Sequence, residues 1–321
     1  MKRRVTKPAA KIDLAELGDK PEEVHVFDDE SVWAINAALA ARRPLLVRGE
    51  PGVGKSQLAR AAAAPEMLNC PLVPFVVDSG TESRDLLWTF DAVKRLAEAQ
   101  VAGALREDGD AVTDRLHVDK FFHPGPLWWA FDWITANAQA ELVGAAIPKT
   151  PDKGWEPGQG CVVLIDEIDK AESDVPNGLL EALGSGTFQP QGRELPVTVE
   201  DNPPLVVITT NGERVLPDAF MRRCLVLDIV LPSKPDELKT LLIERGRAHF
   251  AEASDAVLTS AAEMLVKDRF NTQFTPRPGQ AEYLDLLRIV TELCPGDSAQ
   301  QEKTLERVAA FVLDKKPIGG E

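Results

Sequence analysis

The stretch "LLVRGEPGVGKSQLA", residues 45–59, constrains the fold more than any other part of the chain. It passes from apolar, strand-like residues through a glycine-rich turn into an alanine-rich helical pattern. The turn matches G-x-x-x-x-G-K-[ST], in which the glycines let the backbone close around phosphate oxygens and the next helix offers unpaired N–H groups. Such a turn needs a strand before it and a helix after it, so the sequence predicts an α/β domain.

The residues of this turn predict a site for a nucleoside triphosphate. Lys55 supplies positive charge where the terminal phosphates lie, and the Ser56 hydroxyl is the expected ligand of Mg²⁺. The expected nucleotide-binding residues are Gly49, Glu50, Pro51, Gly52, Val53, Gly54, Lys55, Ser56 and Gln57.

Apolar runs along the first 231 residues predict the rest of the domain. They lack polar alternation, which is typical of strands buried on both faces of a parallel sheet. The runs cover residues 44–48, 72–77, 161–165, 205–210 and 224–231. Helical patterns lie between them, so we expect a three-layer αβα P-loop domain.

The strand pattern stops after residue 231, and four helical segments follow, near residues 236–249, 255–268, 279–293 and 298–314. They predict a small α-helical lid domain. The expected organisation is a flexible N-terminal tail (1–23), a nucleotide-binding domain (24–231) and the helical lid (232–321).

Two carboxylates follow the buried run in "VVLIDEID", namely Asp166 and Glu167. A carboxylate at the C-terminal end of a parallel strand can reach a magnesium ion, and a second one can polarise the attacking water. Acidic residues also end many buried strands without any catalytic role, so the assignment depends on the P-loop. With the P-loop, the pair favours hydrolysis over phosphoryl transfer to a small substrate.

Polar residues further along the chain complete the candidate site. Asn211 follows the run 205–210 and could orient the attacking water, although an Asn at a strand end is also an ordinary turn residue. The arginines near the last strand and in "FTPRPGQ", taken alone, fit solvated surface. The expected catalytic residues are Glu167 and Asn211, to which the family resemblance of these motifs adds Arg222, Arg223 and Arg277, and the expected magnesium ligands are Ser56 and Asp166.

Composition limits the partners. Lys and Arg number 36 against 51 Asp and Glu, and the net charge of −15 repels nucleic acid at long range. The four cysteines stand far apart without a CxxC pair, which indicates neither a disulfide framework nor a zinc site and fits a cytoplasmic protein. No apolar run approaches the roughly 18 residues of a membrane span, so we expect no membrane partner.

Taken in order, these motifs resemble those of the AAA+ ATPases, and specifically of the MoxR-like branch. Residues 49–56 resemble Walker A, 162–167 Walker B and Asn211 sensor 1, while "FMRR" resembles the arginine-finger segment and "TPR" sensor 2. "FFHPGPLWWAF" resembles the end of the family's helix-2 insert, and "GTFQPQGRELPVTV" resembles its pre-sensor-1 hairpin.

The resemblance implies an ATP-hydrolysing ring, usually hexameric, with sites shared between subunits and a chaperone-like action on a protein partner, often one with a von Willebrand factor A domain. Alignment with the family's "RF" ending favours Arg223 as the finger, with Arg222 as the alternative. The chain departs from the family in reading "DEIDKA" for "DEINRA" and "TTNGE" for "TQNP", and in its long segment 81–160. The aromatic residues of that segment fit a core role and a functional role equally well.

Two other functions remain open. A nucleic-acid motor of the restriction or helicase-loader type would carry a basic patch interleaved with aromatics, which the acidic composition disfavours. A monomeric P-loop metabolite kinase would need neither Arg223, Arg277 nor a helical lid.

Overall fold

The computed structural model describes residues 5, 11–14, 23–106, 108–199, 202–271 and 277–313. Contacts within the chain divide it into two compact units. The sheet unit contains Asp29–Val47 and Ala59–Leu227, together with Val5. The helical unit contains Arg48–Leu58 and the chain from Asp228, together with the described residues between 11 and 28.

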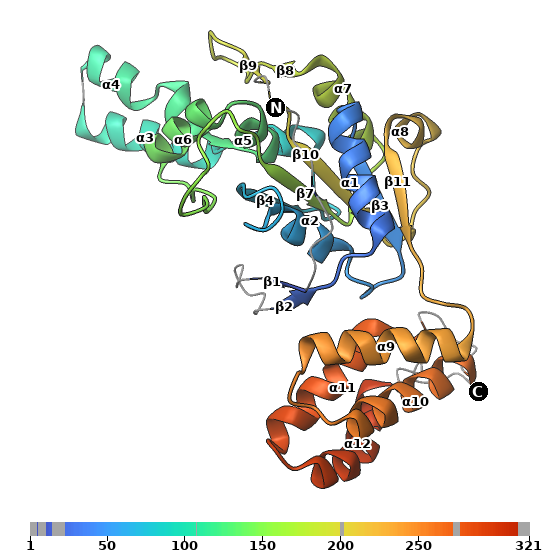
Figure 1. Ribbon diagram of the computed structural model, residues 1–321. Coiled ribbons are helices and arrows are strands. Elements are labelled where there is room, and N and C mark those ends of the chain that lie inside the picture. Colours follow the sequence, from blue (N-terminus) through green and yellow to red (C-terminus); the bar gives the residue numbers. More distant parts are fainter. Residues whose placement is uncertain are drawn as a thin grey trace. The chain divides into compact units, whose positions relative to one another are not determined.

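The sheet unit is built on a parallel sheet whose strand order, within the described residues, is β11-β3-β10-β7-β4. Every residue of the neighbouring strands β7 and β10 is buried, because helices flank the sheet (Figure 1). Val162 of β7 is level with Leu72 on one side and Leu205 on the other. The strands are β3 (Leu45–Gly49), β4 (Leu72–Val76), β7 (Val162–Asp166), β10 (Leu205–Thr210) and β11 (Leu225–Ile229). This architecture confirms the predicted α/β class.

The principal helices that bear on the site are α1 (Asp29–Ala41), α2 (Lys55–Ala63), α7 (Asp174–Ser185) and α8 (Asp218–Arg223). Helix α1 precedes β3, and the other three follow strands β3, β7 and β10. A short antiparallel hairpin, β8 (Thr187–Phe188) with β9 (Val197–Thr198), lies in the segment that resembles the pre-sensor-1 hairpin.

The long segment between β4 and β7 forms an insert in which the antiparallel pair β5–β6 brackets a helical excursion. Its elements are η1 (Ser83–Leu86), β5 (Trp88–Phe90), α3 (Ala92–Leu105), α4 (Gly109–Arg115), η2 (Val118–Phe121), β6 (Phe122–Pro124), α5 (Pro126–Phe131) and α6 (Trp133–Val143). Trp128, Phe122 and Phe131 are buried in the core of the sheet unit, and Trp128 packs edge-on against Phe188. These aromatics therefore serve packing.

The chain beyond the sheet is helical, as predicted. It forms α9 (Pro235–His249), α10 (Asp255–Asn271), α11 (Gln280–Leu293) and α12 (Ser298–Val312), which pack around a common apolar core (Figure 1). Leu242, Leu258, Leu265 and Leu287 are fully buried in this core.

The predicted tail, residues 1–23, falls mainly outside the described residues. Where it is described, it differs from a free tail. Val5 is buried, and its N–H donates to Asn36 Oδ1 at 2.8 Å. Strand β1 (Ile12–Leu14) pairs antiparallel with β2 (Glu23–His25), and the alternation of Ile12 and Leu14 buries both side chains. The predicted domain boundaries stay a prediction.

In the part of the chain that the structure describes, no helix combines the length and apolar character that crossing a bilayer requires.

Candidate functional site

The phosphate-binding loop lies between β3 and α2, and α2 begins at Lys55. Gly52 and Gly54 have φ values of +78° and +93°, in the region that side chains other than glycine rarely adopt. Lys55 is buried, and its Nζ donates to the carbonyl oxygens of Gly49 and Glu50, both at 2.9 Å. The motif residues therefore form a curled loop at a helix start, the geometry that offers N–H groups to phosphate oxygens.

The loop packs against helices of its own unit. A Cβ on Gly52 would lie 2.5 Å from the Ala281 Cβ in α11, and Val53 belongs to the apolar core around α9–α12. The Glu50 carboxylate contacts the Arg269 guanidinium from α10, at 2.9 Å for both Nη2–Oε1 and Nη1–Oε2. Sequence reasoning missed Arg269, although a charged residue four places after Leu265 on an apolar helix face was a usable signal.

Arg277 lies just before α11, in the same unit as the loop, and its side chain is exposed. The carbonyl of its neighbour Pro278 accepts a hydrogen bond from Arg269 Nη1 at 2.9 Å. The structure thus anchors the backbone beside Arg277 and leaves its guanidinium available to solvent or a ligand.

One threonine hydrogen-bonds to both residues of the acidic pair. Thr209, fully buried on β10, donates its hydroxyl to Asp166 Oδ1 at 2.6 Å and accepts the Glu167 N–H at 2.9 Å. The adjacent strands β7 and β10 bring these groups together. Sequence reasoning missed Thr209, whose signal was its place beside Asn211 in "ITTN".

Glu167 occupies the left-handed backbone region, with φ 62° and ψ 48°. Its Oε1 lies 3.5 Å from Asn211 Nδ2, and its Oε2 forms an ion pair with Lys170 Nζ. This hydrogen bond to Glu167 raises the pKa of Lys170. The turn after Asn211 is held by Asp169, whose Oδ2 accepts the Glu213 N–H at 2.8 Å. The structure therefore brings Asp166, Glu167 and Asn211 together, and it adds Lys170, which the i, i+3 spacing in "DEIDK" could have indicated.

The two candidate finger arginines end helix α8, with both side chains exposed. Arg43 holds this end, because its guanidinium donates to the carbonyl oxygens of Arg222, Arg223 and Cys224. All three arginines line a cavity of about 660 Å³ between α8, α7 and the residues before β3. The backbone of the pair is fixed, and the geometry within this chain does not choose between Arg222 and Arg223.

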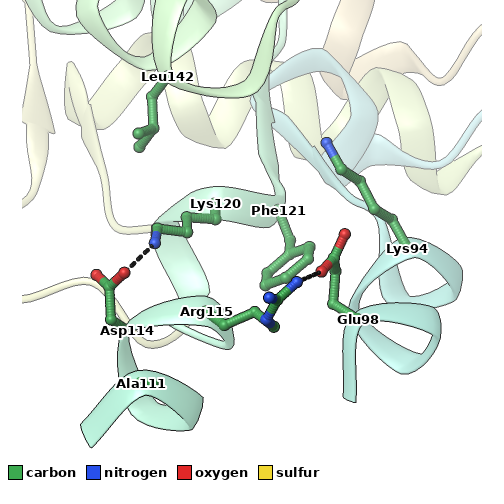
Figure 2. Close-up of a pocket in the computed structure, with 8 residues that line it drawn as sticks. All are labelled: Lys94, Glu98, Ala111, Asp114, Arg115, Lys120, Phe121 and Leu142. Carbon is green, nitrogen blue, oxygen red and sulfur yellow. Dashed lines mark hydrogen bonds and ion pairs between the residues drawn. The ribbon is translucent and has the colours of Figure 1, made fainter. Parts of the chain in front are cut away.

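A second cavity, of about 520 Å³, lies in the insert between α3, α4, η2 and α6 (Figure 2). Arg115 pairs with Glu98 at 2.7 Å and Lys120 with Asp114 at 2.8 Å. Figure 2 shows the Arg115–Glu98 pair next to the buried Phe121 ring and the Lys120–Asp114 pair apart from it. Both carboxylates of the lining are thus engaged by cations, and Lys94 adds a third cationic side chain to the wall.

Residues 44–224 match the family described as AAA domain (dynein-related subfamily). No curated protein matches the chain. The matched residues contain the phosphate loop, the carboxylate cluster and the arginine pair, and they cover more than half of the chain. The chain therefore belongs to the AAA+ ATPases, in the dynein-related AAA subfamily.

Proposed function

We propose that this protein is a MoxR-like AAA+ ATPase that hydrolyses ATP in an oligomeric ring to remodel or activate a protein partner. The observation that carries hydrolysis is the cluster of Asp166, Glu167 and Asn211 around Thr209. A metal-binding carboxylate beside a second carboxylate and an amide suits the activation of water.

The residues present fit ATP and Mg²⁺. Gly52 and Gly54 keep the loop backbone open to phosphate oxygens, and the Ser56 hydroxyl and Asp166 carboxylate are the hard oxygen donors that Mg²⁺ prefers. When bound, Mg²⁺ neutralises charge that develops on the phosphate oxygens. Glu167 accepts the proton of the attacking water and Asn211 orients that water. Lys170 pairs with Oε2 of Glu167, and Oε1 lies on the side of Asn211.

The ring is supported by the arginine pair. Arg222 and Arg223 are exposed at the end of a short helix whose last carbonyls Arg43 anchors, which suits a group presented to another subunit. The hairpin β8–β9 and the long insert contain the sequence segments that resemble those of the MoxR-like branch, and this resemblance supports a pore- or partner-facing role for them. A von Willebrand factor A domain protein is the partner class we propose. The net charge of −15 disfavours nucleic acid as a partner.

The test measures ATP turnover by the purified protein, with its mass followed by light scattering with and without ATP. We expect Mg²⁺-dependent hydrolysis that rises with assembly and is unaffected by DNA. Strong stimulation by DNA would replace the proposal with a nucleic-acid motor. Turnover by a stable monomer, stimulated by a small acceptor, would replace it with a metabolite kinase.

A further inference from the structure

Arg269 is an anomaly in helix α10. Its side chain is about nine-tenths buried, and it follows Ala261 and Leu265 along the apolar face of the helix at intervals of four residues. Burying a guanidinium costs free energy unless hydrogen bonds and an opposite charge compensate it. The partners of Arg269 therefore indicate why an arginine stands there.

Those partners come from two segments that the sequence assigned to nucleotide binding, the phosphate loop and the segment around Arg277. Arg269 forms a two-pronged contact with the Glu50 carboxylate in the phosphate loop, with both N–O distances at 2.9 Å. Its Nη1 also donates to the carbonyl oxygen of Pro278, the residue after Arg277, at 2.9 Å. Only the planar fork of an arginine can make all these contacts, because a lysine ammonium is a single point charge.

Both anchored segments lead directly to groups proposed to meet the phosphates. The carbonyl oxygen of Glu50 accepts a hydrogen bond from Lys55 Nζ at 2.9 Å, so the residue held by Arg269 also holds the phosphate-binding lysine. The packing of the Gly52 backbone on Ala281, at the start of α11, ties the loop to the same helices a second time. The loop therefore has little freedom to shift relative to the Arg277 segment.

We propose that Arg269 is a positioning residue that fixes the phosphate loop and the Arg277 segment relative to each other. This inference rests on the proposed function, since it assigns Arg269 a part in ATP binding and turnover. Arg269 acts through Lys55 and Arg277 and need not touch the nucleotide itself. Its loss lets the two segments drift apart, and a misplaced phosphate-binding group lowers both affinity and rate.

The experiment compares Arg269→Met, Arg269→Lys and Glu50→Gln with a matched control, Arg247→Met. Arg247 also pairs with a carboxylate in the helical unit, Asp255, but this pair lies on the surface away from the loop. Affinity is measured by titration with a fluorescent ATP analogue, and kcat and KM by steady-state hydrolysis. Circular dichroism checks that each variant folds.

We expect Arg269→Met to weaken analogue binding about tenfold and to lower kcat, while Arg247→Met stays within about twofold of wild type. Arg269→Lys should fall between them. Glu50→Gln removes the negative charge and one of the two oxygens that accept from Arg269, so it should weaken binding about threefold. Positioning through Arg277 predicts non-additivity, so Arg269→Met should lower kcat by a smaller factor when Arg277 is already Ala than in the wild-type background.

Equal fold-losses of kcat from Arg269→Met in the wild-type and Arg277→Ala backgrounds would overturn the proposal. So would wild-type affinity in Glu50→Gln, which decides the matter if Arg269→Met does not fold. A wild-type protein that binds the analogue but hydrolyses no ATP would refute the proposed function. The affinities of Glu50→Gln and Arg269→Met would still decide the role of Arg269 in the loop.

Discussion

The phosphate loop and the carboxylate cluster are two halves of the proposed site, and they are built in different ways. The loop is shaped by glycines at positive φ and is held from outside by side chains of helices α10 and α11. The cluster lies at the ends of fully buried strands and is held from within by the Thr209 hydroxyl. One half depends on an adjacent set of helices, whereas the other is part of the sheet itself.

Because the two parts are held differently, nucleotide binding and ATP hydrolysis should respond to different substitutions. Changes in the helical unit should reach the loop and alter nucleotide affinity. Changes at the ends of β7 and β10 should alter turnover while leaving affinity intact. A further question is whether the phosphate loop and the carboxylate cluster of one chain suffice for hydrolysis without a second subunit.

The largest effect is expected for Arg223→Ala. If a neighbouring subunit supplies the finger, this variant should bind ATP normally and lose about 10³- to 10⁵-fold in turnover. Mixed with the equally inactive Lys55→Ala, it should recover activity, because one interface then combines an intact loop with an intact finger. ATPase rate against mixing ratio is the measurement.

Arg222→Ala serves as the matched control for this experiment, since both arginines leave the same anchored helix end. The variant with the larger loss identifies the finger. Mixtures that remain inactive although mixed oligomers form would show that the site is completed within one chain.

The next largest effect is expected for Glu167→Gln, which tests whether binding and hydrolysis depend on separate parts of the site. Glu167→Gln should bind ATP with near wild-type affinity and lose about 10²- to 10⁴-fold in turnover, because the amide cannot take a proton from water. Lys55→Ala should lose binding itself. Nucleotide titration and single-turnover hydrolysis distinguish these outcomes, and equal binding defects in both variants would contradict the separation.

The sequence predicted the parts of the site that follow a motif with a physical reason behind its spacing. The glycines, Lys55 and the acidic pair after the buried run are such residues, as are the positions of all the strands in the parallel sheet. Thr209 and Arg269 were missed because their roles depend on partners brought close by folding, whereas the i, i+3 spacing of Glu167 and Lys170 was a local signal. For Arg269 and Glu50 the separation is 219 residues. The place of Arg269 on an apolar helix face indicates that it is buried, but no local pattern identifies Glu50 as its partner.

A smaller effect is expected from Gly52→Ala, which tests how closely the loop depends on its helices. The new methyl group would meet the Ala281 Cβ at 2.5 Å, and the backbone φ of +78° would be strained. We expect a cost of about 1–3 kcal/mol, seen as a loss of nucleotide affinity of about tenfold or more.

The change Ala281→Gly should restore part of this loss, since it removes the steric conflict but leaves the strained φ. Gly103→Ala is the control, because a methyl group there meets nothing within 4 Å and lies in a regular helix. It should be neutral or slightly stabilising. Full affinity in Gly52→Ala would show that the loop does not need close packing on α11.

The last prediction concerns the pH dependence of stability rather than nucleotide binding or turnover, and it tests whether the two units differ in stability. Burial lowers the pKa of His25 to about 3 and that of His249 to about 4, with Arg245 adding to both shifts. Other charged groups acting on one or both histidines are Lys11, Glu23, Asp28 and Arg288. Both histidines belong to the helical unit.

Because both folded-state pKa values lie below the unfolded value of about 6.5, the unfolded chain takes up protons first as the pH falls. The stabilising contribution is therefore full above pH of about 6.5 and is lost progressively towards pH of about 4, by about 1.4 kcal/mol per pH unit for each histidine. His25→Gln should reduce the pH dependence of the unfolding free energy by the contribution of one histidine.

All six tryptophans lie in the sheet unit, so their fluorescence follows that unit while circular dichroism follows both. Urea midpoints between pH 4 and 7 should show a steep acid loss by circular dichroism that His25→Gln moderates, with a smaller change by fluorescence. An identical slope in His25→Gln and wild type would contradict the contribution of the buried imidazole. Coincident transitions by both probes would show that the two units unfold together. Destabilising the helical unit would then also destabilise the unit that holds the carboxylate cluster.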